Sequence, residues 1–171
     1  MSRGLGDVYK RQEIETDLDT FKADAASIVP AQRAGSIAMA AGVNDGDWCP
    51  INPANMTAKA DDNIYVLGDA SMASSMPKSG FSANSQAKVA ANHIRGALTG
   101  SRVYEPRFAN TCWSLIGTND GIKVGANYKA GTEKIDVTDK FVSQGDETAD
   151  VRKATYEAVS YTHLRAHETP V

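Results

Sequence analysis

The 171-residue sequence has few of the residues that most often carry metal or disulfide chemistry. It contains two cysteines, three histidines and no CxxC pair. No cluster of His, Cys and carboxylate side chains has the spacing of a metal site. No apolar run approaches the roughly 20 residues that span a bilayer. The net charge of −3 gives no basic surface for nucleic acid. We therefore expect no metal site, no membrane span and no nucleic-acid partner.

Both ends of the chain differ in character from its body. Residues 1–12 and 159–171 lack a usable apolar period and resemble translated sequencing-adapter sequence, so we interpret them as non-native tails. Two ordinary disordered tails are the alternative. His163 and His167 have the i, i+4 spacing of a metal pair on a helix. Because both lie in the second tail, we assign them no role.

The first part of the body predicts a hairpin, a short helix, a strand and a long helix. The apolar patterns place these elements at residues 13–30, 34–41, 64–67 and 82–99, with a short extended piece at 49–51. Ser82 is a natural N-cap for the long helix. One face of this helix is dominated by small residues, and we expect it to pack against a sheet: Ala83, Ala87, Ala90, Ile94 and Ala97.

A different pattern begins after a linker at residues 100–107. Two strands are predicted at 111–116 and 122–128, joined by a turn whose Asp-Gly pair is a strong hairpin signal. Residues 134–142 predict a further strand, and residues 146–158 predict an amphipathic helix. The whole body therefore predicts an α/β protein, with a small α+β region at its end.

The most informative stretch is residues 63–70, followed by residues 76–80. The apolar run ends in Gly68-Asp69, which is typical of a buried strand with a carboxylate at its C-terminal tip, where open α/β sheets bind ligands. Gly68 allows a ligand to approach the backbone, and Asp69 can accept hydrogen bonds from the hydroxyls of a ribityl chain. Strand tip, carboxylate, a loop carrying Lys78 and a helix N-terminus are expected to meet at one place.

The sequence resembles the flavoprotein subunit of flavocytochrome c sulfide dehydrogenase, a member of the flavoproteins with two dinucleotide-binding domains. The resemblance covers roughly residues 13–158 and corresponds to the C-terminal part of that subunit. It is carried by five stretches in the expected order, at residues 28–35, 47–51, 63–70, 76–80 and 110–115.

The resemblance implies an FAD-dependent oxidoreductase. Residues 13–100 match the C-terminal part of a Rossmann-like FAD-binding domain, and residues 101–158 match a small interface domain, truncated at its end, that covers the flavin. The residues implied to contact FAD are Gly68, Asp69, Met76, Pro77, Lys78, Ser79 and Gly80. In the related enzymes sulfide attacks a redox disulfide, the flavin is reduced, and electrons pass to a c-type cytochrome subunit in the periplasm.

The two cysteines have different expected roles. A disulfide between Cys49 and Cys112 is possible from the residues alone, and either one could be an ordinary core thiol. The resemblance instead implies that Cys112 is the catalytic redox cysteine and that its partner lies upstream of this chain. It assigns no role to Cys49, which we expect to be a packed structural thiol well beyond bridging distance of Cys112. We also expect Cys112 to lie on the side of its sheet that faces the loop around Lys78.

Several alternatives remain open at this point. Lys78 can offset charge on a reduced flavin, hold a phosphate, or be a solvated surface lysine. The chain has no GxGxxG motif after a strand, which normally cradles the dinucleotide pyrophosphate. The covalent flavin link of the family would also lie outside this chain, so the fragment alone is expected to be inactive. A sulfide:quinone reductase-like flavoprotein and a non-catalytic interaction module of flavoprotein shape are the alternative functions.

Overall fold

The computed structural model describes residues 12–15, 18–26, 28, 31–117, 120–143, 152–154 and 157. The chain divides into two compact units, residues 1–32 and residues 33–171. Residues 1–11 and 159–171 of the predicted tails lie outside the described residues, as does most of the helix predicted at 146–158, of which residues 152–154 and 157 are helical.

The first unit contains the predicted hairpin. Strands β1 (Gln12–Glu15) and β2 (Thr20–Ala23) pair antiparallel, with Ile14 opposite Phe21. An ion pair between Lys22 and Glu13 supports the hairpin on its exposed surface. The second strand ends at Ala23 and is shorter than expected, and Gln12 is the first residue of β1.

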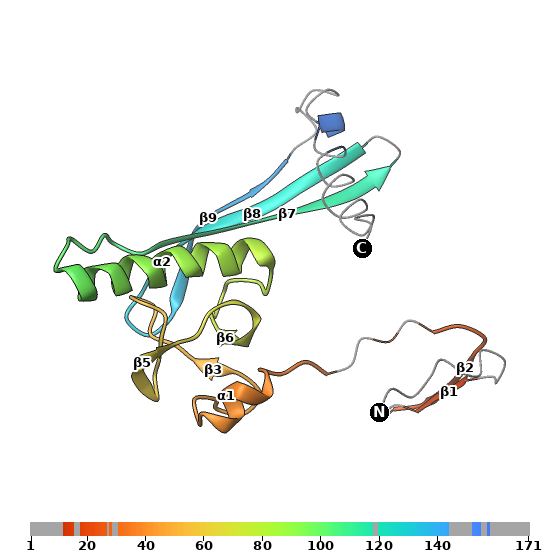
Figure 1. Cartoon of the computed structure of the whole chain (residues 1–171). Helices are drawn as coiled ribbons and strands as arrows, with labels where there is room; N and C mark the ends of the chain where they lie inside the picture. The colour runs from red at the N-terminus through yellow and green to blue at the C-terminus, as the bar shows by residue number, and fades with distance from the viewer. Residues whose placement is uncertain are drawn as a thin grey trace, which may run out of the picture. The chain divides into compact units, whose positions relative to one another are not determined.

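A three-stranded antiparallel sheet forms one side of the second unit (Figure 1). It consists of β7 (Arg107–Gly117), β8 (Asp120–Ala130) and β9 (Ile135–Val142), in the order β7-β8-β9. The strands predicted from the Asp-Gly turn and the apolar alternation are confirmed, and each of the first two is longer than expected. The ring of Phe141 lies so close over Gly125 that a side chain at this position would meet both the ring and the backbone oxygen of Asn110.

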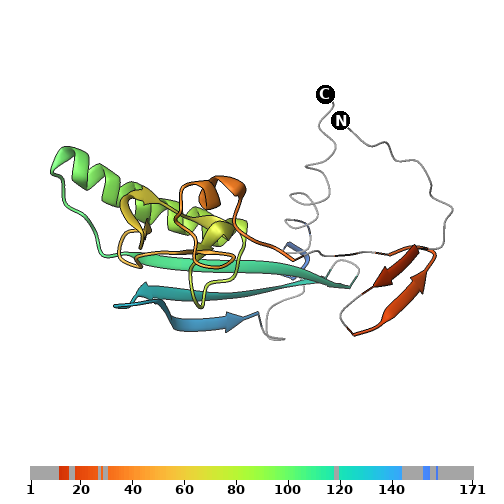
Figure 2. The same ribbon diagram turned by 90° about the horizontal axis from the view of Figure 1, so that it is seen from below.

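The long helix α2 (Gly80–Thr99) packs against β7. Figure 2 shows α2 and the segment from residue 33 to residue 79 on the same side of the sheet. The N-cap is Ser79, not Ser82 as predicted, because the Ser79 hydroxyl accepts a hydrogen bond from the Ser82 amide at 3.1 Å. The helix ends at Gly100, whose positive φ of 67° gives the left-handed cap that glycine favours.

The buried face of α2 also differs from the prediction. The most buried side chains are Ser82, Gln86, Val89 and Ala90, whereas Ala97 is exposed and Ile94 is at the solvent boundary. The stripe of small residues was chosen on apolarity alone. Ala90 of that stripe is buried as predicted, but Ser82 and Gln86 are buried beside it. Each of these polar residues finds hydrogen-bond partners inside the protein, which removes the usual cost of burying a polar group.

The segment between residues 33 and 79 is built from short elements: α1 (Ser36–Ala40), β3 (Cys49–Pro50), β4 (Thr57–Ala58), β5 (Asp61–Tyr65), the 3₁₀ turn η1 (Gly68–Ala70) and β6 (Ser71–Met72). Gly35 caps α1 instead of lying inside it. The predicted extended piece at 49–51 is confirmed as β3, which pairs parallel with β6. The helix stop at Gly42 is confirmed by its positive φ of 67°.

The strand predicted at residues 64–67 is corrected in its bounds and pairing. β5 ends at Tyr65 and pairs antiparallel with β4, and its first three residues are exposed. Val66 is held instead by a backbone hydrogen bond to Met56. Gly68 and Asp69 therefore follow the strand by a short extended link rather than standing at its tip.

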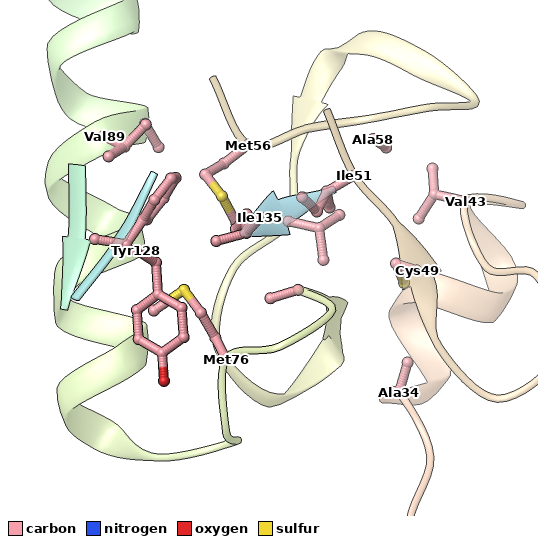
Figure 3. Packing of buried hydrophobic residues seen from close by; sticks show 14 of the residues in the cluster. Ala34, Val43, Cys49, Ile51, Met56, Ala58, Met76, Val89, Tyr128 and Ile135 are labelled. Atoms are coloured by element: carbon pink, nitrogen blue, oxygen red, sulfur yellow. The ribbon is translucent and has the colours of Figure 1, made fainter. Parts of the chain in front are cut away.

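The core joins the short elements to the sheet. Figure 3 shows Met56 and Met76 with Ile135 and Tyr128 from the sheet and Val89 from α2. Because buried apolar surface stabilises by about 25 cal/mol per Å², this shared core fixes the segment before α2 against the sheet. Among the described residues, none of the helices has the length and apolar character needed to cross a membrane.

Candidate functional site

A cavity of about 150 Å³ lies between the η1 turn, the loop before α2 and the first turns of that helix. Five of the predicted site residues meet in its neighbourhood as lining residues: Gly68, Met76, Pro77, Lys78 and Ser79. Asp69 and Gly80 lie beside the lining and are exposed. Cys112 lies outside the lining, on β7.

The η1 turn is held in place by Gln86 from α2. The Gln86 side chain is 2% exposed, and its Oε1 accepts hydrogen bonds from the Gly68 amide at 2.7 Å and the Ser71 hydroxyl at 3.4 Å. Gly68 has a positive φ of 70°, and a side chain there would lie 3.4 Å from the Ala83 Cβ atom. The backbone conformation therefore favours glycine at this position, whereas the distance to Ala83 is one of ordinary contact. These contacts fix where Asp69 is presented.

Lys78 fastens the loop before α2 to the η1 turn. Its Nζ donates to the backbone oxygens of Asp69 at 2.6 Å and Ser71 at 3.0 Å, and it lies 3.6 Å from the centroid of the Trp48 ring. The ring face adds a cation–π attraction. Partial burial lowers the pKa of Lys78, while Asp69 and then Cys49 raise it in part.

A buried polar network joins the start of α2 to β7. Asn110 is 4% exposed, and its Oδ1 accepts hydrogen bonds from the hydroxyls of Ser79 at 2.5 Å and Ser82 at 3.0 Å. Its Nδ2 donates to Cys112 Sγ at 3.4 Å. A second tie between the two elements runs from the Ala109 amide to the Ser85 hydroxyl at 2.9 Å. The helix start is therefore fixed to the strand that carries Cys112.

Both cysteines are free thiols, so the structure contains no Cys49–Cys112 disulfide, as expected. Cys49 is fully buried, and burial raises the pKa of its thiol, an effect that the charge of Lys78 offsets in part. Cys112 is exposed. Because residues two apart on a strand share a face, Cys112 lies on the same face as Asn110, which contacts Ser79 next to Lys78.

Sequence reasoning missed three contributors to this site. Trp48 supplies the aromatic face for Lys78, Gln86 holds the η1 turn, and Asn110 connects the helix start to Cys112. Asn110 stood in the stretch that carried the family resemblance, so that stretch held a signal for it. Trp48 also lies in one of these stretches, at residues 47–51, but no role was assigned to it there. Gln86 lies in none of them, and its role depends on partners that are distant in sequence.

The cavity fits one part of a flavin nucleotide. A site that encloses a whole drug-sized ligand has about 300 Å³ or more, so this cavity of about 150 Å³ can hold only a portion of such a group. The N-terminus of α2 adjoins the cavity at Ser79 and Ser82. The first amides of this helix, at Gly80 and Phe81, have no acceptor within the helix and carry the positive end of its dipole, which suits an electron-rich edge nearby. Trp48 and Met76 give the apolar part of the lining.

Comparison with known protein families supports this interpretation for the part of the chain that forms the sheet. Residues 104–160 match the protein-family model described as flavocytochrome c sulphide dehydrogenase, flavin-binding. The matched segment contains all three strands of the sheet, and both Asn110 and Cys112 lie within it. The match confirms, at residues 104–160, the resemblance to the flavoprotein subunit of flavocytochrome c sulphide dehydrogenase.

Proposed function

We propose that this chain is the C-terminal part of an FAD-dependent sulfide dehydrogenase flavoprotein that passes electrons to a c-type cytochrome subunit. The observation that carries the proposal is the flavin-binding family match at residues 104–160, which includes the exposed thiol of Cys112. A periplasmic location and the cytochrome partner follow from the same family relation. FAD, when bound, accepts an electron pair and releases electrons one at a time.

The residues around the cavity would hold the flavin in different ways. Asp69 would accept hydrogen bonds from ribityl hydroxyls, and Gly68 would allow their close approach. The amides at Gly80 and Phe81 would face the part of the flavin that becomes negative on reduction, which the helix dipole stabilises. Met76 and Pro77 would provide apolar contact. Lys78 would act from behind these groups, because its ammonium is already bound to two loop oxygens and to Trp48.

Cys112 would carry the thiol chemistry. In the oxidised enzyme it would form a disulfide with a cysteine outside this chain. Hydrosulfide attacks the partner sulfur, a new sulfur–sulfur bond forms there, the disulfide bond breaks, and the electron pair leaves on Cys112 Sγ as a thiolate. The negative charge is conserved in this step. The exposure of Cys112 suits such an exchange, since the partner cysteine and the sulfide must both reach it.

The proposed domain division follows the family relation. Residues 13–100 would complete a Rossmann-like FAD-binding domain, and residues 101–158 would form the small domain that covers the flavin. The Gly-rich pyrophosphate motif and the covalent flavin link would come from other parts of the flavoprotein, so the 171-residue chain alone is expected to be inactive.

The role of Asp69 is tested in the full-length flavoprotein by flavin content after gel filtration. We expect Asp69→Ala to lose most of its FAD. Asp62→Ala is the matched control, because Asp62 is an exposed aspartate on β5 near the same turn. Equal flavin content in the two variants would remove Asp69 from the site.

The role of Cys112 is tested by anaerobic flavin reduction with sulfide. We expect Cys112→Ser to retain FAD and to lose reduction by sulfide, whereas Cys49→Val, at the buried thiol, keeps it. A Cys112→Ser enzyme whose flavin is reduced at the normal rate contradicts the proposed chemistry. If the reduced enzyme donates electrons to a quinone but not to a c-type cytochrome, the proposed electron acceptor is wrong.

A further inference from the structure

The buried Asn110 amide is the centre of a hydrogen-bond chain in which the donors point one way. The Ser82 amide of α2 donates to Ser79 Oγ at 3.1 Å, and the Ser79 hydroxyl donates to Asn110 Oδ1 at 2.5 Å. Because Ser79 Oγ already accepts the Ser82 amide, its own hydrogen is free to donate, which orients the Asn110 oxygen towards the serines. Asn110 Nδ2 then donates to Cys112 Sγ at 3.4 Å. The chain runs without a break from a helix amide to a sulfur atom.

The direction of these bonds strengthens the last donor. An amide whose oxygen accepts hydrogen bonds is polarised so that its N–H becomes a stronger donor, and here that oxygen accepts two, from Ser79 and Ser82. The chain also begins in the first turn of a helix of 20 residues, where the unpaired amides carry about half a positive charge. Partial positive charge is thus directed at Cys112 Sγ.

A second buried polar group near this sulfur has no partner. Tyr128 on β8 is 5% exposed, and its hydroxyl makes no hydrogen bond with any of the residues that the structure describes. Burial raises the pKa of Tyr128, and the charge of an ionised Cys112 raises it further, so the two groups interact. The second N–H of the Asn110 amide likewise finds no acceptor in the described part of the chain. The register places Tyr128 opposite Phe108, on the face of the sheet that Asn110 and Cys112 share.

We propose that Asn110 is a positioning residue that orients Cys112 and stabilises the negative charge that its sulfur acquires when the redox disulfide opens. This rests on the proposed function, in which that electron pair leaves on Cys112 Sγ. Stabilising the leaving thiolate speeds the attack on its partner sulfur. A hydrogen bond to a charged group contributes more than one between neutral groups, so the bond from Asn110 strengthens as the charge develops. The hydrogen bond from Asn110 therefore stabilises the reduced state, in which Cys112 is a thiolate, more than the oxidised disulfide state.

The test measures the reactivity of Cys112 in the 171-residue chain, without flavin or sulfide. The rate of alkylation by iodoacetamide, a neutral reagent, is followed across pH and assigned to each cysteine by mass spectrometry. Asn110→Asp keeps an oxygen for the serines but replaces the donor to sulfur with a carboxylate oxygen. Asn110→Leu removes the donor without adding charge. The charged or titratable groups that share this face of the sheet, Asp120 and Tyr128 on β8 and Lys140 on β9, stay unchanged.

We expect both variants to slow alkylation of Cys112 near neutral pH by about tenfold, the size of one hydrogen bond to a charged group. The difference should disappear in alkaline solution, where the thiol is ionised in every variant. A change in access alone would alter the rate equally at all pH values. Ser85→Ala is the matched control, because it removes the other hydrogen bond between α2 and β7 without touching this chain. It should leave the pH profile unchanged.

Cys49 reports folding in the same samples, because it is fully buried and reacts only when the chain opens. An unchanged Cys112 rate near neutral pH, with Cys49 protected, overturns the proposal, and so does a slowing that is equal at all pH values. If the Asn110 variants expose Cys49, Ser79→Ala and Ser82→Ala decide, since each weakens the chain one step earlier. If alkylation of Cys112 in these variants is slower near neutral pH but not in alkaline solution, the proposal is supported. If it is not slower, the proposal is overturned. A Cys112→Ser flavoprotein whose flavin is still reduced by sulfide at the normal rate would instead reject the proposed function and leave this result standing.

Discussion

Replacing Gln86 should loosen the η1 turn more than it disturbs the rest of the protein. Gln86→Met is the informative change, because the unbranched Met side chain fills nearly the same space without the amide. The Gly68 amide then loses its acceptor at 2.7 Å. Ser71 is less affected, because its hydroxyl keeps a bond of 2.8 Å to the Gly68 oxygen. The contact of Gln86 Nε2 with Met76 Sδ at 3.8 Å is weak and contributes little.

The magnitude follows from these contacts. One well-formed hydrogen bond contributes about 1 kcal/mol, and a buried donor left without a partner costs about 1–3 kcal/mol. Gly68 is only half-buried, so water recovers part of this loss. We therefore expect a loss of about 1–2 kcal/mol in the stability of the turn, a factor of roughly 5–30 in its opening equilibrium.

Amide hydrogen exchange at Gly68 is the assay that isolates this effect, with urea unfolding followed by tryptophan fluorescence as the global measure. We expect exchange at Gly68 to accelerate by the factor above. Asn84→Ala is the control, because Asn84 lies on the same helix with its side chain exposed. If Gly68 exchanges at the same rate in Gln86→Met, Asn84→Ala and the unaltered chain, Gln86 does not hold the turn and the reasoning is wrong.

Two further changes test the packing of the sheet and the buried thiol. Gly125→Ala should lower the free energy of unfolding in urea by about 1–3 kcal/mol, because its Cβ would lie 2.5 Å from the Asn110 backbone oxygen and 2.8 Å from Phe141 Cε2. Gly35→Ala, whose Cβ would have no atom within 4 Å, should not lower it. Equal urea midpoints for the two variants would contradict this. Burial raises the pKa of Cys49 above its ordinary 9.0, so the folded thiol stays protonated where the unfolded one ionises, and stability present below about pH 9 falls as the pH rises towards the folded pKa. Cys49→Val should lose less stability between pH 8 and 10, and parallel curves for the two proteins would show that the buried thiol is not the cause.

The strands of the sheet were predictable because their signals are local. An Asp-Gly pair between two alternating runs defines a hairpin within one short stretch, and the structure places β7 and β8 around it. The third strand follows by the same alternation. The bounds were too short because the flanking residues, such as Arg107 and Ala130, carry weak strand propensity and are extended by pairing with their neighbours.

The segment before α2 was harder to predict because its elements depend on distant partners. β3 and β6 are two residues each and exist through their mutual pairing, which no local pattern encodes. The strand expected at residues 64–67 stops early although Val66 still donates to the Met56 oxygen, one position beyond the Thr57–Tyr65 pair. Met56 has a positive φ of 69°, so its backbone does not continue the partner strand. The buried face of α2 was misjudged for the same reason. Ser82 can be buried because Asn110 accepts its hydrogen bond, and Gln86 can be buried because the Gly68 amide donates to its oxygen.

The contacts of Lys78 bear on a role that the sequence left open. Sequence reasoning offered a flavin contact, a phosphate ligand or a solvated surface residue. The ammonium has three N–H donors, two of which bind the oxygens of Asp69 and Ser71 while the group rests against Trp48. Asp69 was expected at the same place as Lys78, whereas the contacts with the Ser71 oxygen and the Trp48 ring were not expected, because they depend on the fold. Lys78 acts on the cavity by holding its wall, and its charge reaches the cavity without a direct bond.

The polar network around Asn110 makes the cavity and the cysteine strand parts of one site. Ser79 and Ser82 line the cavity, while Cys112 lies outside it. The only side chain in the described residues that bonds to both groups is Asn110, and it is buried, so water cannot take over its bonds. A ligand that draws on the first amides of α2 must therefore alter the donor that reaches Cys112, and a charge on Cys112 must alter the helix end that faces the ligand. Because such coupling is reciprocal, the proposed transfer of an electron pair between the thiol and a bound flavin would be stabilised at both ends by the same short chain of hydrogen bonds.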